Sequence, residues 1–109
     1  MKFPKHQYVR SPALLRNVRL IPCQHCGAAD GTVVAAHTNW GAGKGRSIKA
    51  NDNMIAALCF SCHSEIDQGK ELNKHERKNI WYNAHRKTVI QMVEDGLWPA
   101  DVPIPQDMT

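Results

Sequence analysis

The four cysteines are the residues of this sequence whose type and spacing point most directly to chemistry. They form two Cys-X-X-Cys pairs, Cys23 with Cys26 and Cys59 with Cys62. A two-residue spacer lets both thiolates of a pair point at one ion, and two pairs complete a tetrahedral zinc site. We therefore expect a structural Zn²⁺ with four thiolate ligands.

Other uses of these cysteines fit the sequence less well. Neither pair lies in a strand–helix unit of the thioredoxin type, which disfavours a redox role. The segment Cys59–His63 matches the CxxCH motif of haem attachment, but that use needs export and leaves the first pair without a role. His25 could replace a cysteine as ligand, but with four thiolates present we expect it in a solvated loop.

The ends and the hydropathy of the chain favour a cytoplasmic protein. The N-terminus, MKFPKHQ, lacks the apolar stretch of a signal peptide. The longest apolar run, Met54–Phe60, is far shorter than the ~18 residues of a membrane span. Reduced thiolates in the cytoplasm favour zinc over disulfides, in agreement with the proposed metal site.

Short elements flank the two cysteine pairs. Ser11 followed by Pro12 is typical of a helix start, so we expect a helix over roughly 12–17. The segments 32–37 and 54–58 have the composition of strands, and a further helix is expected from about Cys62 to Gly69.

A long helix is predicted after these elements. Asn73 and Glu76 have the spacing of a capping box, and the helix is expected to cover about 74–95 before Gly96. His75 and His85, both on this helix, are interpreted as surface residues. Apolar and small side chains recur at helical spacing and are expected to face the core: Ile80, Trp81, Ala84, Thr88, Val89, Met92 and Val93.

The whole chain of 109 residues is expected to be one α+β domain. Its core covers about 22–69, and a Pro-rich, extended tail covers 98–109. Residues 1–50 carry eight basic residues and one acidic residue, a net +7, whereas residues 51–109 carry six and nine, a net −3. This asymmetry favours a polyanionic partner.

The glycine-rich loop at 41–47 contributes to the basic half. Its order of residues does not match a P-loop, so we expect either contacts with a nucleic-acid backbone or a solvated surface loop. The basic residues expected to contact phosphates are Arg16, Arg19, Lys44, Arg46 and Lys49.

The order of these features along the chain resembles a known family. A cysteine pair, a strand ending in His37, a long loop, a strand, a second pair and His63 follow one another. This order is similar to the zinc-stapled branch of the HNH, or ββα-metal, endonucleases, over about 22–69. The segments Ala36–His37 and Cys59–Asp67, with the long helix, resemble the small prophage-encoded nucleases of the YbcO type.

The resemblance implies roles for individual residues. His37 would be the general base that takes a proton from the attacking water, and His63 a ligand of a second, catalytic divalent cation such as Mg²⁺ or Mn²⁺. Many family members have an Asp before the base histidine, where this sequence has Ala36. Asp67 is the candidate replacement ligand, because it lies four residues after His63 on a helix. It could instead orient His63 or cap the helix.

Two loop residues keep alternative roles. Asn53 or Asp52 would brace the loop through backbone hydrogen bonds, as the middle Asn of the family does, and Asp52 could also bind the cation.

The resemblance thus implies a metal-dependent endonuclease that hydrolyses phosphodiester bonds of DNA, in phage or prophage DNA processing or recombination, as a monomer or a homodimer. One alternative is a zinc-ribbon-like module that binds nucleic acid and cuts nothing, which the missing Asp before His37 favours. Another is a protein-interaction module that works through its acidic, helical half.

Overall fold

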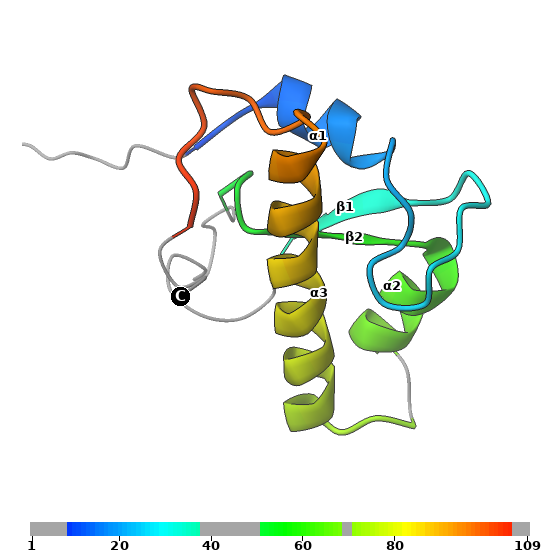
Figure 1. Ribbon diagram of the computed structural model, residues 1–109. Helices are drawn as coiled ribbons and strands as arrows, with labels where there is room; N and C mark the ends of the chain where they lie inside the picture. Colours follow the sequence, from blue (N-terminus) through cyan, green and yellow to red (C-terminus); the bar gives the residue numbers. More distant parts are fainter. Residues whose placement is uncertain (1–8, 38–50, 69–70, 106–109) are drawn as a thin grey trace, which may run out of the picture.

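The computed structural model describes residues 9–37, 51–68 and 71–105 (Figure 1). Within these residues the chain is a small α+β structure with a two-stranded sheet and three helices. The elements in chain order are α1 (Pro12–Val18), β1 (Val34–His37), β2 (Ile55–Leu58), α2 (Phe60–Gln68) and α3 (Lys74–Glu94).

The two strands form an antiparallel hairpin, with Val34 opposite Leu58 and His37 opposite Ile55. All four residues of β2 are buried, because α3 packs against this strand. Figure 1 shows the two strands running across the upper part of α3, with the lower turns of the helix extending beyond them. Small side chains in both strands let the helix approach closely.

Two polar side chains of α3 bind the hairpin directly. The Trp81 indole donates to the Ala36 carbonyl over 3.0 Å. The Thr88 hydroxyl accepts from the Ala57 N–H over 2.9 Å and donates within its own helix to the Ala84 carbonyl. These buried hydrogen bonds fix the position of α3 along the sheet, since leaving either partner unpaired costs about 1–3 kcal/mol.

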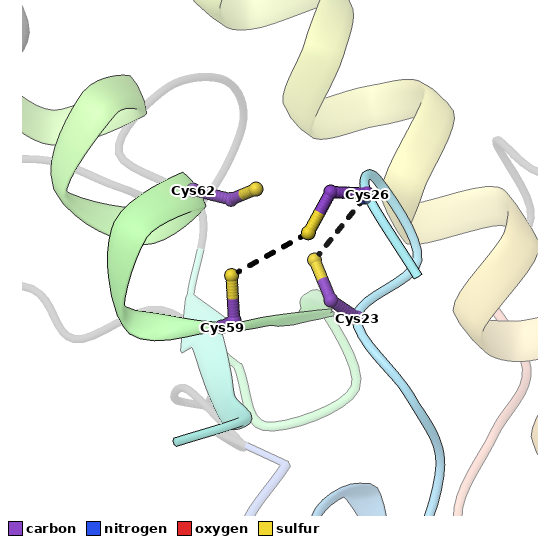
Figure 2. A group of neighbouring side chains, drawn as sticks. All are labelled: Cys23, Cys26, Cys59 and Cys62. Carbon is purple, nitrogen blue, oxygen red and sulfur yellow. Dashed lines mark hydrogen bonds between the residues drawn. The ribbon is translucent and has the colours of Figure 1, made fainter. Parts of the chain in front are cut away.

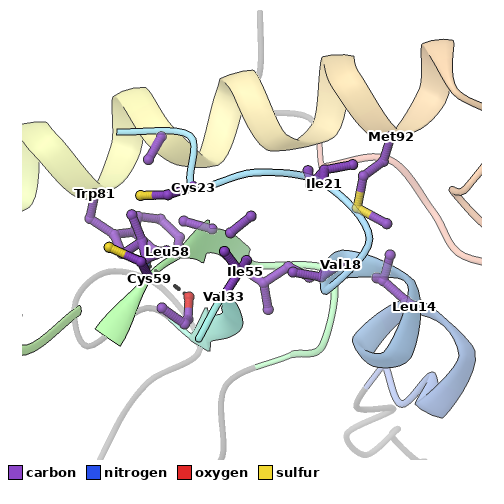
Figure 3. Close-up of a cluster of buried hydrophobic side chains, with 14 of the residues drawn as sticks. Leu14, Val18, Ile21, Cys23, Val33, Ile55, Leu58, Cys59, Trp81 and Met92 are labelled. Atoms are coloured by element: carbon purple, nitrogen blue, oxygen red, sulfur yellow. Dashed lines mark hydrogen bonds between the residues drawn. The ribbon is translucent and has the colours of Figure 1, made fainter. Parts of the chain in front are cut away.

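Helix α1 closes one end of the core. It begins as predicted, because the Ser11 hydroxyl accepts from the Leu14 N–H and Pro12 occupies the first turn. Leu14 and Val18 are fully buried. Figure 3 shows these two residues near Met92 of α3, with Trp81 at the other end of the cluster.

The start of α2 differs from the prediction by two residues. The helix begins at Phe60 rather than at about Cys62. The Phe60 N–H donates to the Thr32 hydroxyl over 2.9 Å, so a residue just before β1 satisfies the free N–H at the helix start. Local sequence does not reveal this contact, because the two residues lie far apart in the chain.

The limits predicted for α3 are confirmed. The capping box is present, with Asn73 accepting from the Glu76 N–H and Glu76 accepting from the Asn73 N–H. The helix ends at Glu94, and Gly96 follows with φ of 72°, a conformation that favours glycine.

The predicted core face of α3 is correct in most positions, with two corrections. Val93 is 46% exposed, and His85 is 1% exposed rather than on the surface. His85 tolerates burial because its Nδ1 hydrogen-bonds to the Ile55 carbonyl over 2.7 Å and its ring stacks on Trp81. An imidazole can hydrogen-bond to a buried carbonyl and stack on an aromatic ring at the same time, so it can occupy a position in the core.

The tail folds back at its start instead of extending freely. The Trp98 indole donates to the Val102 carbonyl over 2.9 Å, and Val102 is buried. Across the described part of the chain, no helix combines the length and apolar character needed to cross a membrane.

Candidate functional site

The four cysteines form one cluster (Figure 2). Their sulfur atoms all lie within 4.8 Å of one another, and the sulfurs of Cys26 and Cys59 are 3.7 Å apart. In a tetrahedral zinc site with Zn–S bonds of about 2.3 Å, neighbouring sulfurs lie about 3.8 Å apart. The cluster can therefore hold a metal ion, and its size and its all-sulfur donor set fit zinc.

Backbone hydrogen bonds shape the first cysteine pair into a tight turn. The Cys23 N–H donates to the Ala28 carbonyl, and the Gly27 N–H donates to the Cys23 carbonyl, both over 2.9 Å. Gly27 has φ of 85°, where a side chain would be strained. The Gln24 N–H donates to the Ala57 carbonyl over 2.8 Å, which ties this turn to β2.

The second pair joins the end of β2 to the first turn of α2. Cys59 directly follows Leu58, and Cys62 lies on the helix. The His63 N–H donates to the Cys59 carbonyl over 2.9 Å, so the helical turn itself sets the distance between the two thiols. The cluster thus links the loop before β1, the strand β2 and the helix α2.

The protonation of the cluster is uneven. Burial raises the pKa of Cys23, but the N–H groups of Cys26, Cys59 and His25 that point to its sulfur lower that pKa to about 6. Burial and the neighbouring sulfurs raise the pKa of the Cys62 thiol. One thiolate, the form that binds metals, is therefore favoured near neutral pH even before an ion enters.

His37 lies at the last position of β1, and its side chain is 36% exposed. Its Nε2 lies 3.0 Å from Oδ1 of Asp52, which is buried. The other carboxylate oxygen of Asp52 accepts from the Ser11 N–H over 2.7 Å, and Nη1 of Arg10 lies 4.0 Å from Oδ1. His37 and Asp52, predicted as separate site residues, are therefore direct partners.

Three consecutive residues, 51 to 53, brace the end of the loop. The Asp52 N–H donates to the Val9 carbonyl, and the Asn51 side chain accepts from the Val9 N–H. The Asn53 amide donates to the Pro103 carbonyl, while its buried Oδ1 has no hydrogen-bond partner among the described residues. Asp52 and Asn51 thus hold the segment before α1, whereas Asn53 holds the tail.

His63 and Asp67 meet on α2, one turn apart. His63 Nε2 and Asp67 Oδ2 are 3.0 Å apart, and each side chain is about one-third exposed. The spacing of four residues places them on the same helix face, as predicted. His25 and His75 are exposed, in agreement with the predictions for these residues.

Two of the predicted phosphate-binding residues are described, and both are exposed: Arg16 lies on α1 and Arg19 directly after it. Lys44, Arg46 and Lys49, together with the glycine-rich loop 41–47, lie outside the described residues.

Arg10, Ser11 and Asn51 are neighbours of this site that were not predicted from the sequence. Ser11 and Asp52 are separated by 41 positions, and Val9 and Asn51 by 42. A helix cap was the only signal at Ser11, and no local pattern indicated that its backbone N–H binds a distant carboxylate.

Comparisons with known proteins give one structural likeness. No protein-family model matches the chain, and no curated protein matches it. A solved structure from Escherichia coli str. K-12 substr. MG1655, described as a "putative bacteriophage protein", matches with a TM-score of 0.53 and 25% identity. The match covers 82% of this chain and 100% of that chain.

Proposed function

We propose that the protein is a zinc-stapled, metal-dependent DNA endonuclease of the HNH type. The observation that supports this most strongly is the placement of two histidines around one hairpin and helix. His37 ends β1 beside a buried carboxylate, and His63 lies on α2 directly after the last cysteine of the cluster.

The four-cysteine cluster would hold a structural Zn²⁺. Four thiolates fill the tetrahedral coordination of zinc, which leaves no position for water or substrate. The ion would therefore fix the first turn against β2 and α2 rather than take part in the reaction. Its effect on catalysis would be to hold the start of α2, where His63 lies, in a fixed position.

His37 would act as the general base. A neutral imidazole can take a proton from water near neutral pH, and the partial exposure of this side chain leaves it accessible to solvent and substrate. The role requires a fixed ring orientation, which the hydrogen bond to Asp52 supplies.

His63 and Asp67 would bind the catalytic cation. Adjacent ligands of an octahedral Mg²⁺ with bonds of about 2.1 Å lie about 3.0 Å apart, and the two donor atoms are 3.0 Å apart. A divalent cation there would stabilise the charge that develops on the leaving oxygen. Asp52 is the weaker candidate ligand, because both of its oxygens already face donors.

The partner proposed for the site is DNA. Arg16 and Arg19 are exposed cations in the basic half of the chain and would contact phosphates without selecting sequence. The likeness to a structure described as a bacteriophage protein agrees with a role in phage or prophage DNA processing or recombination.

A second candidate is a module that binds nucleic acid without cutting it. It is favoured by Ala36, a buried residue at the position where many HNH enzymes carry a metal-binding Asp. One experiment distinguishes the endonuclease from the binding module. The zinc-loaded protein is incubated with supercoiled plasmid and Mg²⁺, Mn²⁺, Co²⁺ or Ca²⁺, with a chelator control for the second ion.

We expect nicked plasmid with at least one of these cations and none with the weak chelator citrate. DNA retention by a gel-shift assay without cleavage under any cation would contradict the endonuclease and support the binding module.

A further inference from the structure

We infer that Asp52 is a positioning residue that holds His37 with its proton on Nε2, so that Nδ1 is the atom that accepts the proton of water. This inference rests on the proposed function and deepens it, because it names the reacting atom of the base and assigns a role to Asp52 other than cation binding.

The first step is the fixed position of the carboxylate. Asp52 is 6% exposed, and its Oδ2 accepts from the Ser11 N–H over 2.7 Å. The backbone N–H of Asp52 donates to the Val9 carbonyl over 2.9 Å. Ser11 is also the N-cap of α1, whose side chains Leu14 and Val18 are in the core. The carboxylate is therefore attached to a rigid part of the fold.

The second step is the direction of the hydrogen bond to His37. An ionised carboxylate has only acceptor atoms, so at 3.0 Å the Nε2 atom of His37 must be the donor. A neutral imidazole carries one N–H group. With the hydrogen on Nε2, the lone pair is on Nδ1, and no hydrogen bond to Nδ1 occurs within 9–37, 51–68 and 71–105.

The third step is the effect on the reaction. When Nδ1 takes the proton from water, the imidazole becomes a cation with N–H groups on both nitrogens. The negative charge of Asp52 stabilises this cation at the Nε2 side. The oxygen of the deprotonated water forms a bond to phosphorus while the bond from phosphorus to the leaving sugar oxygen breaks, and that oxygen takes a proton from solvent water. In this role Asp52 acts on the reaction only through its hydrogen bond to His37.

Replacing Asp52 by Asn tests the orientation with little change in shape. The carboxamide oxygen can still accept from the Ser11 N–H, but its NH₂ group then faces His37 and requires an acceptor at Nε2. The variant Asp52→Asn should therefore move the proton to Nδ1. The base would lose its lone pair at the reacting atom while the fold persists.

The first measurement is the tautomer of His37, read from the ¹⁵N chemical shifts of histidine-labelled protein at a pH where the ring is neutral. The signal is assigned with His37→Gln. We expect the Nε2–H tautomer in the wild type and in the control Asp101→Asn, and the Nδ1–H tautomer in Asp52→Asn. An Nδ1–H tautomer in the wild type, or an unchanged tautomer in Asp52→Asn, would overturn the inference.

The second measurement is the single-turnover cleavage rate. We expect Asp52→Asn to lose activity on the order of 10²–10⁴-fold at unchanged DNA affinity, with partial recovery in Asp52→Glu. A defect that high Mg²⁺ restores would instead make Asp52 a cation ligand and overturn the positioning role. Absence of cleavage in the wild type would refute the proposed function alone, because the tautomer still decides how Asp52 holds His37.

Discussion

His63 and Asp67 are the pair of residues through which a catalytic cation would enter the proposed reaction. Their donor atoms are 3.0 Å apart, and each side chain is about one-third exposed on α2, where the spacing of four residues places them on one helix face. A pair of this kind binds weakly on its own, so substrate phosphate would have to complete the coordination. Single substitutions should therefore change the cation requirement before they change the fold.

We expect His63→Ala to raise the Mg²⁺ or Mn²⁺ concentration needed for half-maximal cleavage, with part of the rate recovered at high cation. Asp67→Asn should behave in the same way if Asp67 is a ligand. If it only orients His63, the effect should be milder, about 10–100-fold in metal affinity or activity. Glu65→Gln, on the same helix, is the control. Defects in both variants that no cation concentration relieves would contradict the metal assignment.

At the scale of the elements, the cysteine cluster joins the turn before β1, the end of β2 and the start of α2. The turn that carries Cys23 and Cys26 is tied to β2 by the hydrogen bond from the Gln24 N–H to the Ala57 carbonyl. The start of α2 is fixed by the Thr32 hydroxyl and the two cysteines of the second pair. A metal ion at the four sulfurs would therefore contribute binding free energy directly to folding.

We expect about one Zn²⁺ per chain, and we expect a strong chelator to abolish the cooperative unfolding transition seen by circular dichroism. The same loss should follow acidification, because protons compete with zinc for the thiolates, so the stabilisation is present at neutral pH and is lost as pH falls. Cys59→Ser should remain unfolded with zinc, whereas the control Ser61→Ala should bind zinc normally. Cooperative unfolding of a metal-free sample would contradict the structural role of the ion.

Over the whole molecule, local patterns in the sequence predicted the elements better than the contacts between them. The Ser11 cap and the capping box at Asn73 each depend on a few consecutive residues, and both predictions are confirmed. The cysteine spacing predicted that the four thiols meet, and they form one cluster that could hold a metal ion. The burial of His85 agrees with helical spacing, because this residue lies between Trp81 and Thr88 on the core face. Its polar side chain led to the surface prediction, because the carbonyl that accepts its hydrogen bond lies 30 positions away in the chain.

The site follows the same rule. His37, His63 and Asp67 were predicted as site residues from the resemblance to HNH endonucleases, and the shared helix face of the latter two follows from their spacing. The partnership of Asp52 with His37 and with the backbone before α1 depends on how the segment around residue 10 meets the end of the loop. No hydrophobic periodicity or sequence motif predicts these contacts between distant segments.

The most direct test of the account is the rate at which the His37→Ala variant nicks supercoiled plasmid, relative to the wild type purified in the same way. The comparison is made at saturating cation, with equal zinc content and equal DNA affinity confirmed for both proteins. We predict a loss on the order of 10²–10⁴-fold, as expected for removal of a general base. An undiminished nicking rate in His37→Ala would contradict the proposed mechanism.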